Sequence, residues 1–158
     1  DSFVHFTIAD DQVPDVEPST RAQEIARTLV EENEIVAIVG HFSSGLCQEA
    51  GEIYGENRIV MISPTCTATG LTLGENTLNS YFFRTVPNDA VAAQTLFEEV
   101  SAAGQQVAVI YDDNTYSKSF KKSFGEGLID QDYIYECSLI SSDSPAFDPE
   151  QCAVEIAQ

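Results

Sequence analysis

The chain has 158 residues, of which 43% are hydrophobic, enough to bury the core of one ordinary domain or of two small lobes. Lysine and arginine total 7 against 26 aspartate and glutamate residues, so the formal net charge is −19. This balance argues against binding to nucleic acid or to an anionic membrane surface, because both interactions need positive charge. No apolar run in the sequence is long enough to cross a bilayer.

Short apolar runs alternate with segments in which apolar residues recur at helical spacing. In chain order we expect a strand at 3–9, a helix at 20–33, a strand at 35–39, a helix at about 45–55, a strand at 58–63, an irregular stretch at 71–80, a strand at 81–85, a helix at 89–102, a strand at 106–111, a helix at 117–129, a strand at 133–140 and a last helix from 148. A capping box at Thr20–Gln23 and the side chain of Asp89 are expected to start two of the helices. Because most strands are continuous apolar runs, the pattern predicts a doubly wound α/β fold with mostly parallel sheets covered on both faces.

Hydroxyl-rich loops follow the ends of several expected strands, and ligands bind beyond the carboxyl ends of strands in open parallel sheets. The candidate site therefore lies at residues 42–45, 64–69 and 112–116. The strand at 35–39 leads through Ser43 and Ser44 directly into a helix. The N–H groups at the start of that helix, with the helix dipole behind them, favour an anionic ligand. Phosphate is disfavoured because no glycine-rich phosphate loop is present.

Two enzymatic interpretations compete with a binding site. A hydrolase would need a base beside the serines, and neither His5 nor His41 is well placed in the sequence. No GxSxG motif is present, and we interpret His41 as a hydrogen-bonded structural residue at a strand end. The acidic pairs Asp10–Asp11 and Asp112–Asp113 leave open an intracellular α/β enzyme with a metal held at Asp10 and Asp112. Capping and turn formation are the commoner roles of such pairs.

The four cysteines are Cys47, Cys66, Cys137 and Cys152, and no two of them form a CxxC motif. A zinc ribbon or a thioredoxin-type site is therefore not indicated. The even number is compatible with disulfides in an oxidising compartment. Of the three pairings we favour Cys47–Cys66 with Cys137–Cys152, because the members of each pair lie on successive elements. Four buried free thiols are the alternative.

Five segments, in this order, resemble the type I periplasmic binding proteins. They are Asp10-Asp11 followed by a helix, Val-Gly-His-Phe-Ser-Ser-Gly at 39–45, Met-Ile-Ser-Pro-Thr-Cys-Thr at 61–67, Phe-Phe-Arg-Thr-Val-Pro-Asn-Asp at 82–89, and Val-Ala-Val-Ile-Tyr-Asp-Asp-Asn-Thr-Tyr-Ser at 107–117. The likeness covers about residues 3–156. It is strongest to the branch that binds leucine, isoleucine and valine for ABC transporters or sensory receptors.

The resemblance implies two flavodoxin-like lobes with an amino acid held in the cleft between them, without a catalytic step or a cofactor. Matched motif by motif, Ser44 would meet the ligand carboxylate, and the backbone of Thr65 would add to it. Thr67 would reach both the carboxylate and the amino group, and Cys66 lies in the same loop. Tyr116 would line the cleft from the second lobe. A carboxylate also suits a helix start flanked by hydroxyls.

The matched segments make up only part of the family fold. Residues 1–86 resemble most of the N-terminal lobe without its first strand and helix, and residues 87–158 resemble the first half of the second lobe. The absent strand would lie between the strands at 3–9 and 35–39, and the acidic residue that usually pairs with the ligand's ammonium lies in the missing part. We therefore expect a fragment, whose exposed sheet edges would be satisfied in a homodimer or by strand exchange.

The resemblance predicts an extracytoplasmic solute-binding protein or sensor domain for a small amino acid or amide. Such a protein is periplasmic or extracellular. Its implied partners are the amino acid and, for the parent system, a membrane permease or a sensor kinase. Nucleic acid is not among them.

Overall fold

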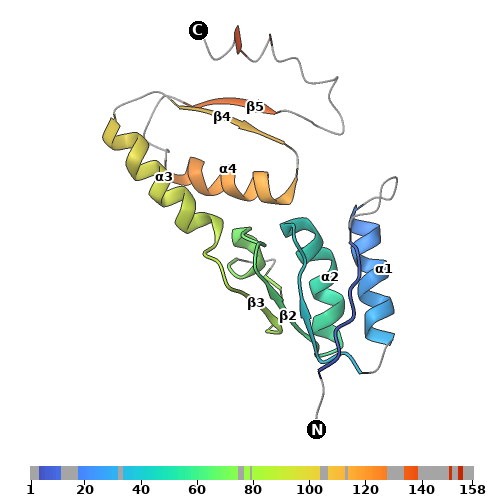
Figure 1. The fold of residues 1–158 in the computed structure, drawn as a ribbon. Helices are drawn as coiled ribbons and strands as arrows, with labels where there is room; N and C mark the ends of the chain where they lie inside the picture. Colours follow the sequence, from blue (N-terminus) through green and yellow to red (C-terminus); the bar gives the residue numbers. More distant parts are fainter. Residues whose placement is uncertain are drawn as a thin grey trace. The chain divides into compact units, whose positions relative to one another are not determined.

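The computed structural model describes residues 4–11, 18–31, 34–74, 77–78, 80–103, 107–112, 114–127, 134–138, 150 and 153–154. Its elements are α1 (Pro18–Glu31), β1 (Ala37–Val39), α2 (Ser44–Glu56), β2 (Val60–Ser63), the 3-10 helix η1 (Thr69–Leu71), β3 (Phe82–Arg84), α3 (Asp89–Ala103), β4 (Val107–Tyr111), α4 (Thr115–Gly127) and β5 (Ile134–Ser138) (Figure 1). Helices and strands alternate, and neighbouring strands pair in parallel. The α/β fold class is confirmed.

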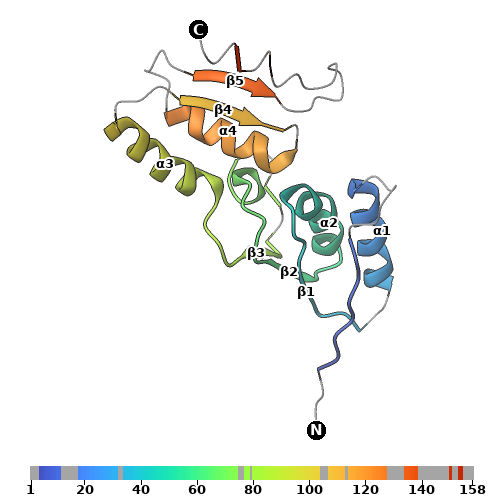
Figure 2. The same ribbon diagram turned by 45° about the horizontal axis from the view of Figure 1, so that its top comes forward.

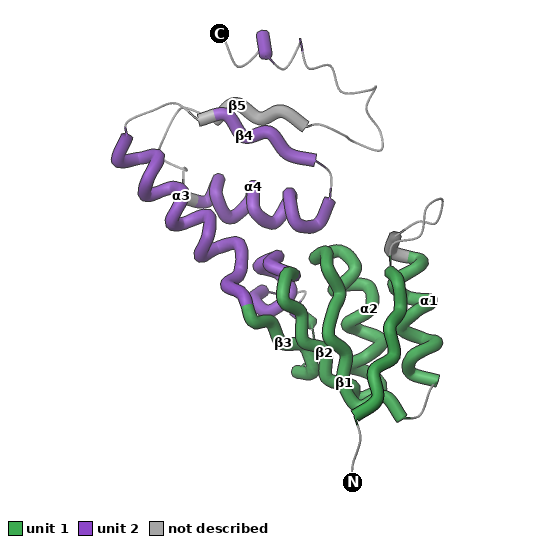
Figure 3. Tube along the Cα trace, viewed as in Figure 1, with its two compact units in different colours: residues 1–65, 78–85 green, residues 66–77, 86–158 purple. Residues whose placement is uncertain are grey.

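The chain divides into two compact units (Figure 3). Unit 1 consists of residues 1–65 and 78–85, and unit 2 consists of residues 66–77 and 86–158. The boundary between units therefore passes through the loop after β2, and the short segment 66–77 belongs to the second unit. The assignment of residues 1–86 and 87–158 to two family lobes stays a prediction.

The sheet of unit 1 has the strand order β1-β2-β3. Its register sets Ile38 beside Met61, and Met61 beside Phe82, so these side chains share one face. Helix α2 packs on β2 and on α1. The buried apolar side chains of the unit are Ala22, Ile25, Ala26, Leu29, Leu46, Cys47, Ala50, Tyr54, Ile59, Met61, Leu78 and Phe82. Their removal from water supplies the main driving force for folding.

The opposite face of the same sheet is open in the part of unit 1 that the structure describes. The register aligns Val39 with Ile62 and Ile62 with Phe83. Val39 is 81% exposed and Phe83 is 52% exposed. Within the described residues of unit 1 these side chains are exposed, and the covering of both faces of this sheet stays a prediction. A continuous apolar run shows that a strand can be buried on both faces. It does not show which helices or segments cover those faces.

The expected strand at 3–9 is also corrected, because residues 4–11 form no strand in the described structure. The segment runs alongside β1 without a ladder (Figures 1 and 2). Its alternate residues Val4, Phe6 and Ile8 are 80%, 87% and 95% exposed. A strand needs a partner for its N–H and C=O groups, and strand-like composition alone does not provide one.

Helix starts differ from the expectations by a few residues, for local reasons. Helix α1 begins at Pro18, two residues before the capping box, because proline suits the first turn of a helix. Asn88 caps α3 instead of Asp89: its Oδ1 accepts a hydrogen bond from the N–H of Val91 at 3.2 Å. The 3-10 helix η1 lies mostly outside the stretch expected to be irregular, and its first residue is Thr69.

Unit 2 contains the parallel pair β4-β5. Helices α3 and α4 pack against each other, with Ala93 and Phe124 buried at their contact. Phe97, Val109 and Phe120 pack around this pair. The last expected helix falls largely outside the described residues. Among the residues that are described, no helix has the length and apolar character needed to cross a membrane.

Candidate functional site

The end of β1 leads into the start of α2, as the sequence indicates. Ser43 is the N-cap residue, in extended conformation, and its Oγ accepts a hydrogen bond from the N–H of Leu46 at 3.4 Å. Ser44 is the first residue of α2 and is only 2% exposed. Phe42 precedes them and is 70% exposed. The helix start thus presents the positive end of its dipole beside a buried serine and an exposed aromatic ring.

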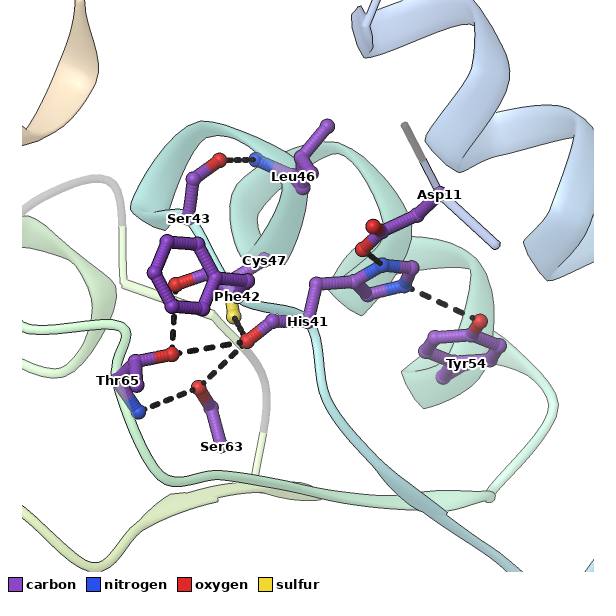
Figure 4. Close-up of polar contacts among 9 residues, drawn as sticks. All are labelled: Asp11, His41, Phe42, Ser43, Leu46, Cys47, Tyr54, Ser63 and Thr65. Atoms are coloured by element: carbon purple, nitrogen blue, oxygen red, sulfur yellow. Dashed lines mark hydrogen bonds and ion pairs between the residues drawn. The ribbon is translucent and has the colours of Figure 1, made fainter. Parts of the chain in front are cut away.

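Hydrogen bonds join this helix start to the loop after β2 (Figure 4). The hydroxyl of Ser63 donates to the carbonyl of His41 at 2.9 Å, and the hydroxyl of Thr65 donates to the carbonyl of Phe42 at 2.6 Å. The N–H of Thr65 donates to Ser63 Oγ at 3.2 Å. The expected loop at 42–45 and the first two residues of the expected loop at 64–69 therefore meet in unit 1. The side chain and N–H of Thr65 already hold the loop together within the protein.

A buried polar row lies behind the helix start (Figure 4). The Nδ1 atom of His41 is 2.6 Å from Asp11 Oδ2, and its Nε2 atom is 3.3 Å from the hydroxyl of Tyr54. Burial, and then the nearby Asp11 carboxylate, raise the pKa of Tyr54 to about 12. The phenol therefore stays protonated and donates to Nε2, which leaves Nδ1–H to donate to Asp11. His41 is thus hydrogen-bonded at the end of a strand, as expected, and its interpretation as a structural residue stays a prediction.

In unit 2, the segment that begins at Cys66 packs on the starts of two helices. The N–H of Asp89 donates to the carbonyl of Thr67 at 2.8 Å. Thr69 accepts from the N–H of Ala90 at 3.1 Å through its Oγ1, and its own N–H donates to Ser119 Oγ at 2.8 Å. The hydroxyl of Thr67 is buried and has no hydrogen-bond partner among the described residues. It is therefore an unused polar group of the kind that a ligand can engage.

Tyr116 lies in the first turn of α4 and is 47% exposed. Its ring contacts that of Phe120, with 6.2 Å between the centroids. Helix α4 starts earlier than expected because Asn114 caps it, accepting from the N–H of Ser117 at 2.8 Å. Tyr116 has the exposure needed for a ligand contact, and its role as a cleft residue stays a prediction.

Cys47 and Cys66 are each disulfide-bonded and fully buried. This contradicts the alternative of four free thiols. The described part of the structure does not include the side chain of Cys137, or Cys152 at all. The pairing of Cys47 with Cys66 stays a prediction.

The metal site considered at Asp10 and Asp112 is not supported. Among the described residues, no group of three or more His, Cys, Asp or Glu side chains is placed to hold a metal ion. Asp10 is exposed, and Asp112 Oδ2 accepts from the amide of Asn114 at 2.8 Å. Asp112 thus has the turn-forming role that is common for such residues.

These features define an α/β protein with polar loops at the carboxyl ends of parallel strands. The chain belongs to the periplasmic binding protein family, whose model matches residues 4–132. An amino acid binding protein of Pseudomonas aeruginosa is 33% identical over 113 residues. A leucine-specific-binding protein of Salmonella typhimurium is 31% identical over 112 residues. An ABC transporter substrate-binding protein from Desulfitobacterium hafniense, solved in complex with Leu, is 26% identical with a TM-score of 0.65.

The matches cover most of this chain and a minor part of each relative. The first two cover 70% and 68% of this chain, and 27% and 29% of the relatives. The solved structure matches 85% of this chain, which corresponds to 39% of its own. All three are named for binding and none for catalysis, so the alternative of an enzyme finds no support among them.

Sequence reasoning missed several residues that organise the site. Asp11 and Tyr54 hold His41 from segments 30 and 13 residues away in the chain, and no local pattern links them. The sequence indicated Ser63 only as the last residue of an apolar strand and gave no sign of its hydrogen bonds. Asp89 was interpreted as a helix cap, although the asparagine before it offered the same capping chemistry.

Proposed function

We propose that this chain is part of an extracytoplasmic solute-binding protein or sensor domain that binds a small amino acid or amide without chemical change. The family and the names of the relatives support binding of an amino acid. The ligand residues we propose are Ser44, Thr65, Cys66, Thr67 and Tyr116. The acidic surface agrees with this function, since a zwitterion held by neutral hydroxyls and a helix dipole needs no lysine or arginine.

The unpartnered hydroxyl of Thr67 carries the proposal. A buried hydroxyl that lacks a hydrogen bond costs about 1–3 kcal/mol. A ligand carboxylate would accept a hydrogen bond from the Thr67 hydroxyl, and a ligand ammonium would donate a hydrogen bond to the Thr67 hydroxyl oxygen. Thr65 lies two residues before it in the sequence, and within unit 1 its hydroxyl donates to the carbonyl of Phe42, just before the start of α2. A carboxylate at that helix start would gain from the dipole.

Binding would be read out by a partner. We propose export to the periplasm or the cell exterior, and a membrane permease or a sensor kinase as the partner of the parent system. The open sheet face of unit 1 and the exposed residues 4–8 are compatible with a homodimer or with strand exchange.

Isothermal titration calorimetry with the twenty amino acids tests the proposed function. We expect a dissociation constant in the micromolar range or below for at least one small or branched amino acid. Magnesium and ATP serve as control titrants, because the enzyme alternative requires one of them. Heat released by these controls and by no amino acid would contradict the proposal.

A further inference from the structure

We propose that the lysine face of α4, formed by Lys118, Lys121 and Lys122, docks on an acidic surface of a partner protein. This inference goes beyond the proposed function, because it concerns a protein contact and holds whichever amino acid the chain binds. The lysine face lies entirely within unit 2.

The positive charge of the chain is unevenly distributed. All of its lysines lie on α4, between residues 118 and 122, although the formal net charge of the chain is −19. The helix has a single acidic residue, Glu126, near its end. Helix α4 therefore carries an excess of positive charge on an otherwise acidic chain.

The three sides of α4 have different surroundings. Phe120 and Phe124 pack into the apolar core of unit 2 with residues of α3 and β4. The hydroxyl of Ser119 accepts from the N–H of Thr69 at 2.8 Å, and that of Ser123 lies 3.3 Å from Thr69 Oγ1. With 3.6 residues per turn, the lysines share the remaining side of the helix.

The lysine face is open among the described residues. The side chain of Lys122 is 79% exposed, and Lys118 is also exposed. Gly125 lies on the same side of the helix, about one turn after Lys121. A Cβ added at Gly125 would meet nothing within 4 Å. The described part of unit 2 therefore leaves this face accessible to another protein.

Two of the lysines make contacts that leave their charge available to a partner. Lys122 Nζ is 3.9 Å from Glu126 Oε1, and both side chains are mostly exposed, so this ion pair is weak. Lys121 Nζ lies 4.2 Å from the centre of the Tyr111 ring and donates to its hydroxyl at 3.1 Å. Because Lys121 is already ordered, its contact with a carboxylate costs less side-chain entropy.

A compact acidic protein surface suits this face better than an extended polyanion does. Nucleic acid and anionic membranes spread their charge over areas far larger than one helix face, and they would also meet many of the 26 acidic residues. At physiological ionic strength, charges separated by more than about 8 Å are largely screened, so a small acidic surface interacts mainly with the lysines that it touches. Lysine ammonium groups form charge-assisted hydrogen bonds with carboxylates.

The lysine face points away from the residue of α4 that we propose as a ligand contact. Tyr116 lies two positions before Lys118, and at 3.6 residues per turn their side chains are about 160° apart around the helix axis. Docking at the lysine face would thus leave Tyr116 uncovered. Changes to the lysines should therefore leave the affinity for an amino acid unaltered.

Fluorescence anisotropy with a labelled acidic peptide tests the inference on the full chain. The probe is an alanine-based helical peptide with a glutamate at every fourth position, and the same peptide with glutamines is its control. The variant Lys118→Gln/Lys122→Gln removes the two exposed charges of the lysine face. Arg27→Gln/Arg58→Gln removes two exposed positive charges elsewhere and gives the same net charge, so it is the matched control variant.

We expect the wild type to bind the glutamate peptide at low salt, to lose affinity as NaCl is added, and not to bind the glutamine peptide. Lys118→Gln/Lys122→Gln should weaken binding by about fivefold or more and make it less sensitive to salt, since two exposed charge pairs are lost. Arg27→Gln/Arg58→Gln should bind the peptide as the wild type does.

The inference is overturned if the wild type does not bind the glutamate peptide at low salt. It is also overturned if the two double variants weaken binding equally, because net charge would then explain the effect. Tighter binding to a DNA duplex or to phosphatidylglycerol vesicles than to the peptide would contradict a protein partner. A dimer in sedimentation velocity that dissociates in Lys118→Gln/Lys122→Gln would contradict it too, because the lysine face would then bind a second copy.

Calorimetry with L-leucine separates this inference from the proposed function. Lys118→Gln/Lys122→Gln should bind leucine with the affinity of the wild type. Loss of leucine affinity in this variant would place the lysines in the ligand site and overturn the inference. A wild type that binds no amino acid contradicts the proposed function alone, and the peptide experiment still decides whether the lysine face docks on an acidic surface.

Discussion

The Nδ1 atom of His41 lies 2.6 Å from the Oδ2 atom of Asp11 and ties the segment of residues 4–11 to the end of β1. The segment forms no strand and its apolar side chains are exposed, whereas Asp11 at its end is hydrogen-bonded to the buried His41. The backbone carbonyl of His41 also accepts a hydrogen bond from the hydroxyl of Ser63. His41 thus connects the N-terminal segment through its side chain, and the candidate site through its backbone carbonyl.

We predict that stability falls at alkaline pH because of Tyr54. Its pKa is raised from 10.0 to about 12 in the folded protein, so between these values the folded state holds a proton that the unfolded state has lost. The stabilising contribution is complete below pH 10 and is lost as the pH rises toward 12. Two pKa units correspond to at most about 3 kcal/mol. Urea unfolding at pH 8 and pH 11 should show this loss in the wild type and a smaller one in Tyr54→Phe.

We predict that Asp11→Asn destabilises the chain by about 1–3 kcal/mol, because it weakens a charge-assisted hydrogen bond to a buried histidine. Glu52→Gln, at an exposed position of α2, is the control. Urea denaturation at pH 7 measures both. Equal midpoints for the two variants would show that the Asp11–His41 contact contributes nothing to stability.

We predict that Gly51→Ala lowers stability by about 1–3 kcal/mol through overpacking. An added Cβ would lie 2.8 Å from Leu78 Cδ1 and 2.9 Å from Met61 Cε. Gly125→Ala is the control, because a Cβ at this position in α4 meets nothing within 4 Å. Alanine should stabilise that helix by about 0.5–1 kcal/mol. Thermal unfolding should therefore shift in opposite directions for the two variants.

We predict that Ser44→Ala and Thr67→Val each weaken amino acid binding by about 1–3 kcal/mol, because each leaves a polar group of the ligand unpaired. Thr77→Val, at an exposed position, is the control and should bind as the wild type does. Thr67→Val should not destabilise the unliganded chain, since the hydroxyl that it removes has no partner among the described residues. Unchanged affinity in both variants would remove these residues from the proposed site.

We predict that peptide mapping without reduction finds Cys47 and Cys66 in one disulfide. Both side chains are buried and disulfide-bonded. Reduction should lower stability by about 2–4 kcal/mol, because it frees the unfolded chain from a cross-link. A map that joins either cysteine to Cys137 or Cys152 would refute the pairing.

Local patterns in the sequence were sufficient to predict the α/β class, the order of most elements and the loops of the candidate site. Apolar runs of strand length and helical periodicity do not depend on distant residues, and a proline or serine marks a helix start wherever it lies. The resemblance of five motifs pointed to the family that the comparisons confirm. Ser44, Thr65 and Thr67 could be proposed on the same basis.

Only the tertiary structure decided which polar groups are already satisfied and which are not. It assigned the hydroxyl of Thr65 to Phe42 and left the hydroxyl of Thr67 and Oδ2 of Asp89 buried without partners. It also showed that residues 4–11 lack a ladder and that one face of the unit 1 sheet is exposed. Hydrogen-bond satisfaction and burial depend on residues far apart in the chain, so a one-dimensional pattern predicts elements and leaves their partners open.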